Sequence, residues 1–537
     1  MTTTSGEARP SLRKDRVGPP FRRLLVANRG EIAVRIIRTC RDLGVETVAV
    51  FSDADADAMH VELADAAVRL GPSPAGESYL RADAVIAAAR DSGAEAIHPG
   101  YGFLSERASF ARAVSDAGLV FIGPSADAIE ALGDKLAARR TAQAHGVPVV
   151  PGTFEPAPVD RAVDVDAIVD EAERVGFPLL VKASAGGGGR GMRRVASARE
   201  LPAALAAGSA EARAAFGDGA VYLEREVRPA RHIEVQLLGD HDGTIVALGE
   251  RDCSIQRRHQ KLVEETPAPG LRAEERVSLH AMAIAAARAA KLHNAATAEF
   301  LFDTDRRFWF LEVNARLQVE HGVTELVTDL DLVAEQLWIA AGHPLSGAVR
   351  RAAEASGTPT RHAIEVRLAA EDPSRDFAPV PGRIGSWVMP SGPGVRVDTA
   401  VRAGERVPPD YDPMIAKIMT TGSDRAEAIT RMRRALDEVV VTGIQTTLPF
   451  DRALVRDPAF VVGDDLSTDW VERRWDGPAD RASSYRRAAE VAAAAALAGT
   501  RSGNDGSSGE TSLRKDNDLD RPWLEAGRQA GIDRWPR

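Results

Sequence analysis

Alternating polar residues make segment 308–320 the strongest chemical signal in this sequence. The segment reads FWFLEVNARLQVE, and every second residue from Glu312 to Glu320 is polar. Residues two apart share a face of an extended chain, so these polar side chains are predicted to line one side of a strand. Residues 297–302 read as a second strand, and residues 303–307 as the polar turn between the two. We therefore predict a β-hairpin with one polar face.

Two carboxylates of this hairpin are predicted to meet. Closing the hairpin at 303–307 would place Glu299 opposite Glu312, with their Cβ atoms about 5 Å apart. Two carboxylates at that distance repel by roughly 3 kcal/mol at an effective dielectric of about 20. A divalent cation removes the repulsion, and two carboxylates plus an amide oxygen suit Mg²⁺ or Mn²⁺ better than a soft metal. The alternative is a solvated hairpin at a sheet edge.

Glu320 is predicted to act apart from this metal. Along a strand that rises about 3.3 Å per residue, Glu320 lies too far from Glu312 to share an ion unless the backbone bends. Its carboxylate is then free to act as a base on a second reactant. Arg316 and Lys261 would bind that reactant if it is a small oxyanion.

Lysine is scarce in this chain, so the positions of the lysines are informative. Only seven of the 68 basic residues are lysines. Lysine carries a compact point charge, whereas arginine presents a planar fork. Lys135 begins a predicted helix and Lys182 ends a predicted strand, and we expect both to contact phosphates. Lys261 lies in segment 251–261, which is dense in hydrogen-bond donors and has a solvated basic loop as its alternative interpretation.

A run of glycines follows Lys182. Residues 183–192 read ASAGGGGRGM and lie between the predicted strands 176–182 and 193–195. A G-x-G-x-x-G match occurs here, but a dinucleotide fingerprint needs a helix directly after it, and a Walker loop needs a Gly-Lys-Ser/Thr ending. We predict a flexible flap whose backbone N–H groups cover phosphates. A mobile surface hairpin is the alternative.

The surrounding elements indicate an α/β protein. Strands and helices alternate from residue 23 to residue 122, which predicts a doubly wound parallel sheet with ligands near the carboxyl ends of its strands. The loop 97–106 would lie at such an end, where Glu106 either faces a ligand or serves the loop alone. Short strands and turns over 385–419, followed by a helix over 425–441, predict a smaller mixed α+β subdomain.

Composition bounds the class of protein. A hydrophobic fraction of 44% and a mean hydropathy of -0.20 are typical of a soluble globular protein. The sequence has no apolar run long enough for a membrane span and no hydrophobic signal core at its start. A net charge of -10 argues against a nucleic-acid partner. The two cysteines, Cys40 and Cys253, lie far apart and indicate reduced thiols, so we expect a cytoplasmic protein without membrane contact.

Five motifs carry a family resemblance. In chain order they are VANRGEIA from Val26, HPGYGFLSE from His98, KASAGGGGRGM from Lys182, RDCSIQRRHQK from Arg251 and EVNARLQVEH from Glu312. Together they resemble biotin carboxylase, the ATP-grasp component of acetyl-, propionyl- and related acyl-CoA carboxylases. The resemblance implies that ATP phosphorylates bicarbonate to carboxyphosphate, which releases CO₂ beside biotin. The freed phosphate or a protein base then takes the ureido proton, and biotin captures the CO₂.

The resemblance covers residues 21–475 and implies a domain order. The expected parts are a disordered arm (1–20), an N-terminal domain (21–134), an ATP-grasp domain (135–340) with a mobile glycine-rich lid (about 155–227), a C-terminal mixed α+β domain (341–475), a helix and flexible linker (476–519), and a possible docking tail (520–537).

The resemblance also assigns roles to single residues. It implies that ATP is bound by Lys135, Lys182, Gly188, Gly189, Glu224, Arg225, Glu226, Val227, His232, Gln256 and His259. It implies that Mg²⁺ or Mn²⁺ is held by Glu299, Glu312 and Asn314. Bicarbonate would be held by Lys261, Arg316, Gln318 and Val319. Glu320 would deprotonate the bicarbonate, and Arg367 would stabilise the enolate oxygen of biotin.

Biotin is expected to arrive on another molecule. Biotin attaches to lysine in an Ala-Met-Lys-Met setting, and none of the eight methionines is followed by lysine. We therefore expect a biotin carboxyl carrier protein and a carboxyltransferase subunit as separate partners, and a homodimer of this chain. The alternatives are another ATP-grasp ligase, of carbamoyl-phosphate or aminoimidazole-ribotide type, and a catalytically silent scaffold protein.

Overall fold

The N-terminal part is built on five parallel strands. The structure, a computed structural model, describes residues 18–157, 165–184 and 192–501. The strands lie in the order β3-β2-β1-β4-β5. Their bounds are Arg23–Val26 (β1), Glu46–Ser52 (β2), Ala66–Gly71 (β3), Ala96–His98 (β4) and Val120–Phe121 (β5).

Helices cover both faces of this sheet. Leu25 packs with residues of α3 (Ala82–Asp91) and α4 (Ala108–Asp116), whereas its neighbours Leu24 and Val26 pack with α1 (Gly30–Leu43). Successive side chains of a strand point to opposite faces, so β1 contributes to two separate cores. The predicted doubly wound parallel sheet is confirmed.

The centre of the molecule is an antiparallel sheet of eight strands. Its order is β13-β12-β9-β10-β11-β14-β21-β19. The bounds are Phe308–Asn314 (β13), Asn294–Asp303 (β12), Ala230–Gly239 (β9), Ile245–Arg257 (β10), Gln260–Thr266 (β11), His362–Ala369 (β14), Met414–Gly422 (β21) and Val395–Thr399 (β19). Because β11 pairs with β14, one sheet runs through both the expected ATP-grasp domain and the expected C-terminal domain.

A small separate sheet has the order β7-β6-β8. Its strands are Leu179–Ala183 (β6), Arg193–Val195 (β7) and Val221–Arg225 (β8), and they share a core with α7 (Val165–Val175) and α8 (Leu201–Phe216). The strands on either side of the glycine run pair antiparallel, with Leu179 opposite Val195. Gly188 and Gly189 lie outside the described residues, as do residues 1–17 of the predicted arm, residues 502–519 of the predicted linker and the predicted docking tail 520–537.

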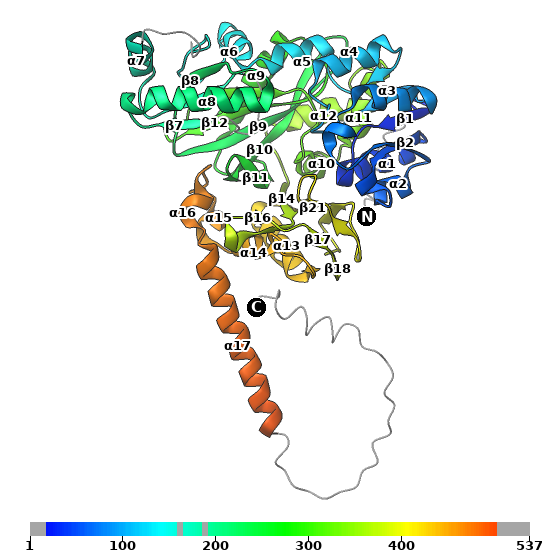
Figure 1. The fold of residues 1–537 in the computed structure, drawn as a ribbon, viewed down its shortest axis with the longest axis vertical. Coiled ribbons are helices and arrows are strands. Elements are labelled where there is room, and N and C mark those ends of the chain that lie inside the picture. The colour runs from blue at the N-terminus through cyan, green and yellow to red at the C-terminus, as the bar shows by residue number, and fades with distance from the viewer. Residues whose placement is uncertain (1–17, 158–164, 185–191, 502–537) are drawn as a thin grey trace, which may run out of the picture.

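The remaining helices complete the chain. They are α2 (Met59–Leu63), α5 (Ala126–Gly133), α6 (Lys135–Ala144), α9 (Ala273–Ala289), α10 (His321–Thr328), α11 (Leu332–Ala340), α12 (Gly347–Ala355), α13 (Arg425–Glu438), α14 (Leu448–Leu454), α15 (Pro458–Val462), α16 (Trp470–Arg474) and α17 (Gly477–Arg501). Figure 1 shows α17 projecting from the body. Its first turns are tied down by Arg481, which donates to Asp372 at 2.9 Å and to Ser374 at 2.8 Å. Within the described residues, no helix has both the length and the apolar character that crossing a bilayer requires.

Candidate active site

A row of charged side chains crosses four strands of the central sheet. Glu312 of β13 lies opposite Glu299 of β12, which confirms the predicted register of the hairpin. On the other side of β12, Glu299 lies opposite Glu234 of β9, and Glu234 lies opposite Arg251 of β10. Cross-strand partners on one face are close neighbours, so three carboxylates and a guanidinium share one surface of the sheet.

Lys261 neutralises two carboxylates of this row together with the carboxylate of Glu320. Its Nζ lies 2.5 Å from Glu234, 3.0 Å from Glu299 and 2.7 Å from Glu320. Burial alone would lower the pKa of the Lys261 ammonium, but these carboxylates outweigh burial and raise that pKa well above its usual range. The segment 251–261 is therefore not the solvated loop of the alternative interpretation. It forms the end of β10, a turn at His259 and the start of β11.

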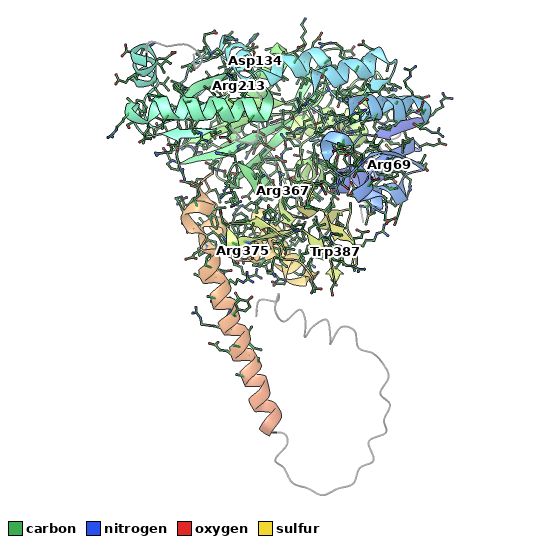
Figure 2. The ribbon with its side chains drawn as sticks, in the orientation of Figure 1. Arg69, Asp134, Arg213, Arg367, Arg375 and Trp387 are labelled. Carbon is green, nitrogen blue, oxygen red and sulfur yellow. The ribbon has the colours of Figure 1, made fainter. Side chains whose placement is uncertain are left out.

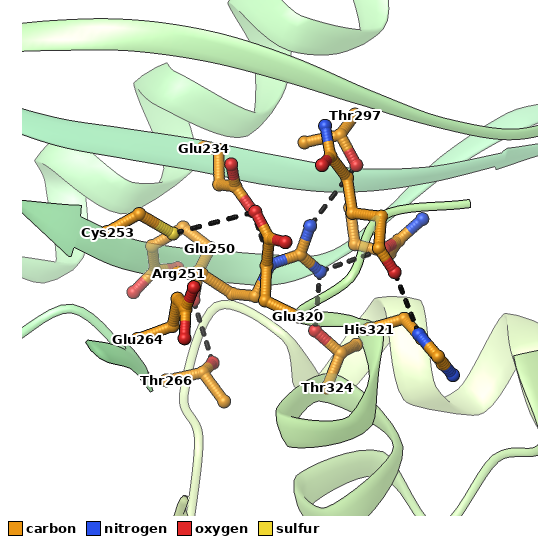
Figure 3. Close-up of polar contacts among 12 residues, drawn as sticks. Glu234, Glu250, Arg251, Cys253, Glu264, Thr266, Thr297, Glu320, His321 and Thr324 are labelled. Atoms are coloured by element: carbon orange, nitrogen blue, oxygen red, sulfur yellow. Dashed lines mark hydrogen bonds and ion pairs between the residues drawn. The ribbon is translucent and has the colours of Figure 1, made fainter. Parts of the chain in front are cut away.

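Arg251 ends the row on β10 and links it to neighbouring side chains. Its side chain is fully buried and donates to Glu234 at 2.6 Å, to Gln236 at 2.8 Å, to Thr324 at 3.0 Å and to Thr297 at 3.2 Å. Figure 3 shows this fan of contacts beside Glu320. The role of Arg251 and Glu234 was not predicted, although the alternation of His232, Glu234 and Gln236 along one strand was a signal for it.

The predicted strand 308–320 is wrong beyond Asn314. β13 ends there, and residues 315–320 form a bend and a turn before α10. The backbone groups of this segment bond to side chains instead of to a strand, since the carbonyl of Gln318 accepts from His321 Nδ1 at 2.8 Å. This departure from the extended path brings Glu320 back to Lys261, the same ammonium that binds Glu299.

Glu320 lies between two cations. One carboxylate oxygen contacts Lys261, and the other accepts from Arg367 at 2.9 Å. Glu320 is 0% exposed, whereas the side chains of Lys261 and Arg367 are 12% and 18% exposed. Burial would raise the pKa of the Glu320 carboxyl, but Lys261 and Arg367 hold it well below its usual range. Glu320 is thus an ionised carboxylate that is covered by the two cations predicted to bind the reactants.

Arg367 links Glu320 to a second buried acid. It donates to Glu264 of β11 at 2.6 Å, and Figure 2 places Arg367 near the middle of the body. Burial raises the pKa of the Glu264 carboxyl to about 7, against the opposing effect of Arg367. Glu264 lies opposite Glu365 of β14, and both acids are 0% exposed. Sequence reasoning missed Glu264, because its partner lies 103 residues away.

The two predicted phosphate lysines are each paired with an acid. Lys135, at the start of α6, lies 2.8 Å from Glu312. Lys182, on β6, lies 2.6 Å from Glu224, and Glu224 also contacts the buried Arg139. Each lysine is thus neutralised by an acid that is itself a predicted ATP or metal ligand.

Glu299 is the predicted metal ligand around which possible ligand atoms gather. One carboxylate oxygen of Glu299 accepts hydrogen bonds from Lys261, from Asn314 Nδ2 at 2.9 Å and from Gln318 Nε2 at 3.4 Å. The other oxygen lies 3.2 Å from His232. Ligand atoms of His232, Glu234 and Glu299 all lie within 4.8 Å of one another. Two carboxylates of this cluster suit Mg²⁺ or Mn²⁺. Of the other predicted ligands, Glu312 pairs with Lys135 and Asn314 turns its amide N–H to Glu299, so the set Glu299, Glu312 and Asn314 stays a prediction. In this structure the Lys261 ammonium supplies the positive charge next to Glu234 and Glu299.

The remaining predicted residues make contacts of their own around the row. Arg316 donates to Glu106 at 2.8 Å and to Asn314 at 3.3 Å, which brings the loop 97–106 to the site. Gln256 donates to the carbonyl of Cys253, and Glu226 accepts from Arg194. The guanidinium of Arg225 lies 5.7 Å from the centre of the Trp309 ring, and Val227 lies two residues further along the chain. His259 lies in the β10–β11 turn, and the carbonyl of Val319 accepts from Lys417.

Comparison with known proteins identifies this arrangement. Three family models match the chain in order: biotin carboxylase, N-terminal domain (residues 20–129), carbamoyl-phosphate synthase L chain, ATP binding domain (134–348), and biotin carboxylase C-terminal domain (365–473). The chain belongs to the biotin carboxylase family. The resemblance predicted from the motifs is confirmed, and the chain is an ATP-dependent ligase of the biotin-dependent carboxylases.

Several biotin carboxylases are similar over nearly their whole length. Biotin carboxylase 1 of Bacillus subtilis is 47% identical over 453 residues, covering 84% of this chain and 98% of the relative. One of the pyruvate carboxylase subunits of Methanothermobacter thermautotrophicus is 45% identical over 453 residues, covering 84% and 90%. A solved structure of the biotin carboxylase domain dimer of Hydrogenobacter thermophilus 2-oxoglutarate carboxylase, with MgADP, ADP and bicarbonate, has a TM-score of 0.80 at 40% identity, covering 84% and 97%.

Proposed function

We propose that this chain uses ATP and bicarbonate to carboxylate biotin on a separate carrier subunit, through carboxyphosphate, with Glu320 as the base. The observation that supports this most directly is the placement of Glu320 between Lys261 and Arg367. A small oxyanion that contacts Lys261 would lie against the carboxylate that accepts its proton.

The two cations also set the strength of this base. They keep the pKa of Glu320 low, and a carboxylate of low pKa is a weak base. When bicarbonate takes up contacts with Lys261 and Arg316, part of that positive charge is shared with the substrate. The proton affinity of Glu320 then rises at the moment when a proton is to be taken. Arg367 would remain to neutralise the enolate oxygen of biotin.

The nucleotide would bind near Glu312, at the β13 end of the row. Lys135 and Lys182 would contact its phosphates, with Glu224, Arg225, Glu226, Val227, His232, Gln256, His259, Gly188 and Gly189 as the remaining ligands. Mg²⁺ or Mn²⁺ held by Glu299, Glu312 and Asn314 would neutralise phosphate oxygens. In that state Lys135 is released from Glu312 and becomes available to the nucleotide.

The proposed partners follow from the missing biotinyl lysine and from the relatives. We propose a biotin carboxyl carrier protein, a carboxyltransferase subunit, and a homodimer like the domain dimer of the 2-oxoglutarate carboxylase. The proposed acceptor is an acyl-CoA of acetyl or propionyl type, in the cytoplasm. Pyruvate and 2-oxoglutarate are the competing acceptors, since relatives of similar identity carry those names.

The test is ATP cleavage by the purified chain. We expect turnover that depends on both bicarbonate and free biotin, and loss of that turnover in Glu320→Gln but not in Glu354→Gln, an exposed acid on α12. Turnover that ignores biotin would favour another ATP-grasp ligase, and no turnover would favour a scaffold role. Native partners purified with the chain, assayed with acetyl-CoA, propionyl-CoA, pyruvate and 2-oxoglutarate, would identify the acceptor. A biotinylated band on an avidin blot of the chain itself would contradict the separate carrier.

A further inference from the structure

Lys417 is a fully buried lysine that the proposed function does not use. Lys135, Lys182 and Lys261 all belong to the site, and their side chains are 17%, 13% and 12% exposed. The side chain of Lys417, on β21, is 0% exposed. Burying an ammonium is costly unless it is paired and hydrogen-bonded, so its partners indicate what it holds.

The Lys417 ammonium joins three parts of the chain. Its Nζ donates to the carbonyl of Val319 at 2.7 Å and lies 3.2 Å from Glu31 and 4.0 Å from Asp398. Glu31 belongs to the segment matched by the N-terminal family model, Val319 to the ATP-binding one, and Lys417 to the C-terminal one. A single charge therefore fixes the catalytic segment relative to both neighbouring domains.

The carbonyl that Lys417 holds belongs to the residue directly before Glu320. Residues 315–320 lie in neither a strand nor a helix, so side chains fix their path. Lys417 lies opposite Arg367 in the β14–β21 register. Neighbouring positions of one sheet thus hold Glu320 from both ends, Arg367 at its carboxylate and Lys417 at the preceding carbonyl.

The acids around Lys417 keep it in its ammonium form. Burial lowers the pKa of Lys417, but these acids, Glu31 foremost, outweigh burial, and the net pKa is raised. Glu31 also accepts from Tyr101, so this acid has a second partner when Lys417 is removed. If Lys417 only balanced charge, neutralising Glu31 would be enough to replace it. If Lys417 also holds the carbonyl of Val319, neutralising Glu31 would not be enough.

We propose that Lys417 is a positioning residue that sets the distance from Glu320 to the reactants by holding the carbonyl of Val319. The proposal rests on the proposed function, in which Glu320 is the base. A displacement of a catalytic group by about 1 Å can cost about 100-fold in rate. The ATP ligands lie on other elements, so binding of ATP should survive the loss of Lys417.

The experiment compares Lys417→Met with the double variant Glu31→Gln/Lys417→Met. We expect Lys417→Met to lower kcat for biotin- and bicarbonate-dependent ATP cleavage by about 10- to 100-fold, with KM for ATP changed less than about threefold. It should also lower the Tm, because Glu31 loses its cation. The double variant has no unpaired charge at that position, so its Tm should recover while its kcat stays low. Lys291→Met, at an exposed lysine between α9 and β12, serves as the matched control.

The outcomes separate this proposal from the function on which it rests. Recovery of kcat in the double variant would mean that Lys417 only balances charge, and would overturn the positioning role. Full activity of Lys417→Met beside an inactive Glu320→Gln would overturn it as well. An active Glu320→Gln would instead remove the base, and with it both the proposed function and this inference.

Discussion

Replacing Lys261 by methionine is the sharpest test of how the carboxylate row is neutralised. Methionine keeps most of the length of the side chain but removes the ammonium that contacts Glu234, Glu299 and Glu320 at 2.5, 3.0 and 2.7 Å. At an effective dielectric of about 20, each contact is worth about 6 kcal/mol before desolvation is counted. Desolvation offsets most of that, so we expect Lys261→Met to cost about 3–5 kcal/mol of stability.

The three acids left behind then repel one another. Ligand atoms of Glu234 lie within 4.8 Å of Glu299 and within 4.8 Å of Glu320. Each such pair repels by about 3 kcal/mol at an effective dielectric of about 20. In the wild type, Lys261 lowers the pKa of Glu299 and Glu320, so their contribution to stability is present above pH 4.5 and is lost as the pH falls through the lowered pKa. In the variant that contribution is missing at neutral pH, and both pKa values rise.

A divalent cation should replace the missing ammonium. Without nucleotide, Mg²⁺ must compete with Lys261 for Glu299 in the wild type, but not in Lys261→Met. We expect MgCl₂ to raise the Tm of Lys261→Met clearly more than that of the wild type, with NaCl of equal ionic strength and Lys291→Met as controls. An equal rise in both proteins would refute the idea that Lys261 occupies a cation position among these acids. The variant should also lose about 100-fold in kcat, which a bicarbonate-dependent ATP assay would measure.

Two further predictions concern the buried surroundings of the site. A Cβ added at Gly322 would clash with Met419 Sδ, so Gly322→Ala should cost about 1–3 kcal/mol of stability in denaturant unfolding. The cost should largely vanish in a Met419→Val background, and additive effects of the two substitutions would contradict this packing. The pKa of Glu264 is raised from 4.5 to about 7 by burial, so its neutral form supplies stability that is full below pH 4.5 and is lost as the pH rises through about 7. Glu264→Gln, which stays neutral, should therefore match the wild type below pH 4.5 and exceed it by up to about 3 kcal/mol above pH 8. A gain that is independent of pH would count against a buried titrating acid.

Local pattern located the parts of the site whose partners are close in sequence. The polar turn 303–307 pairs Phe302 with Phe308, and a register shift between Glu299 and Phe300 then places Glu299 opposite Glu312. The predicted pairing is confirmed, although the turn alone would set Glu299 opposite Leu311. The alternation from Glu312 to Glu320 was misread as one strand, because polar residues also alternate where a chain bends among charged partners. Past Asn314 the segment bonds to side chains of β11, β14 and β21, and these strands cannot be located from the segment itself.

Partners distant in sequence account for what was missed. Glu234 and Arg251 become neighbours of Glu299 only because β9 lies between β12 and β10. Glu264 and Arg367 pair only because β11 lies beside β14 across a gap of 103 residues. Alternation shows that one face of each strand is polar, but it does not order the strands in the sheet. The roles of Arg367, Glu224 and His232 were reached only through the family resemblance, and they stay predictions.

The pairing of β11 with β14 makes the carboxylate row dependent on the C-terminal domain. Lys261 lies on β11, and Arg367 and Lys417 lie on the next two strands of the same sheet, so the cations that hold Glu320 come from both sides of a domain boundary. A chain ending after α11 would expose the edge of β11 and leave Glu320 and Glu264 without Arg367. The ATP-binding domain alone therefore has the phosphate lysines but only one of the two cations that hold its base. Nucleotide binding and proton transfer should thus respond differently to substitutions on β14 and β21.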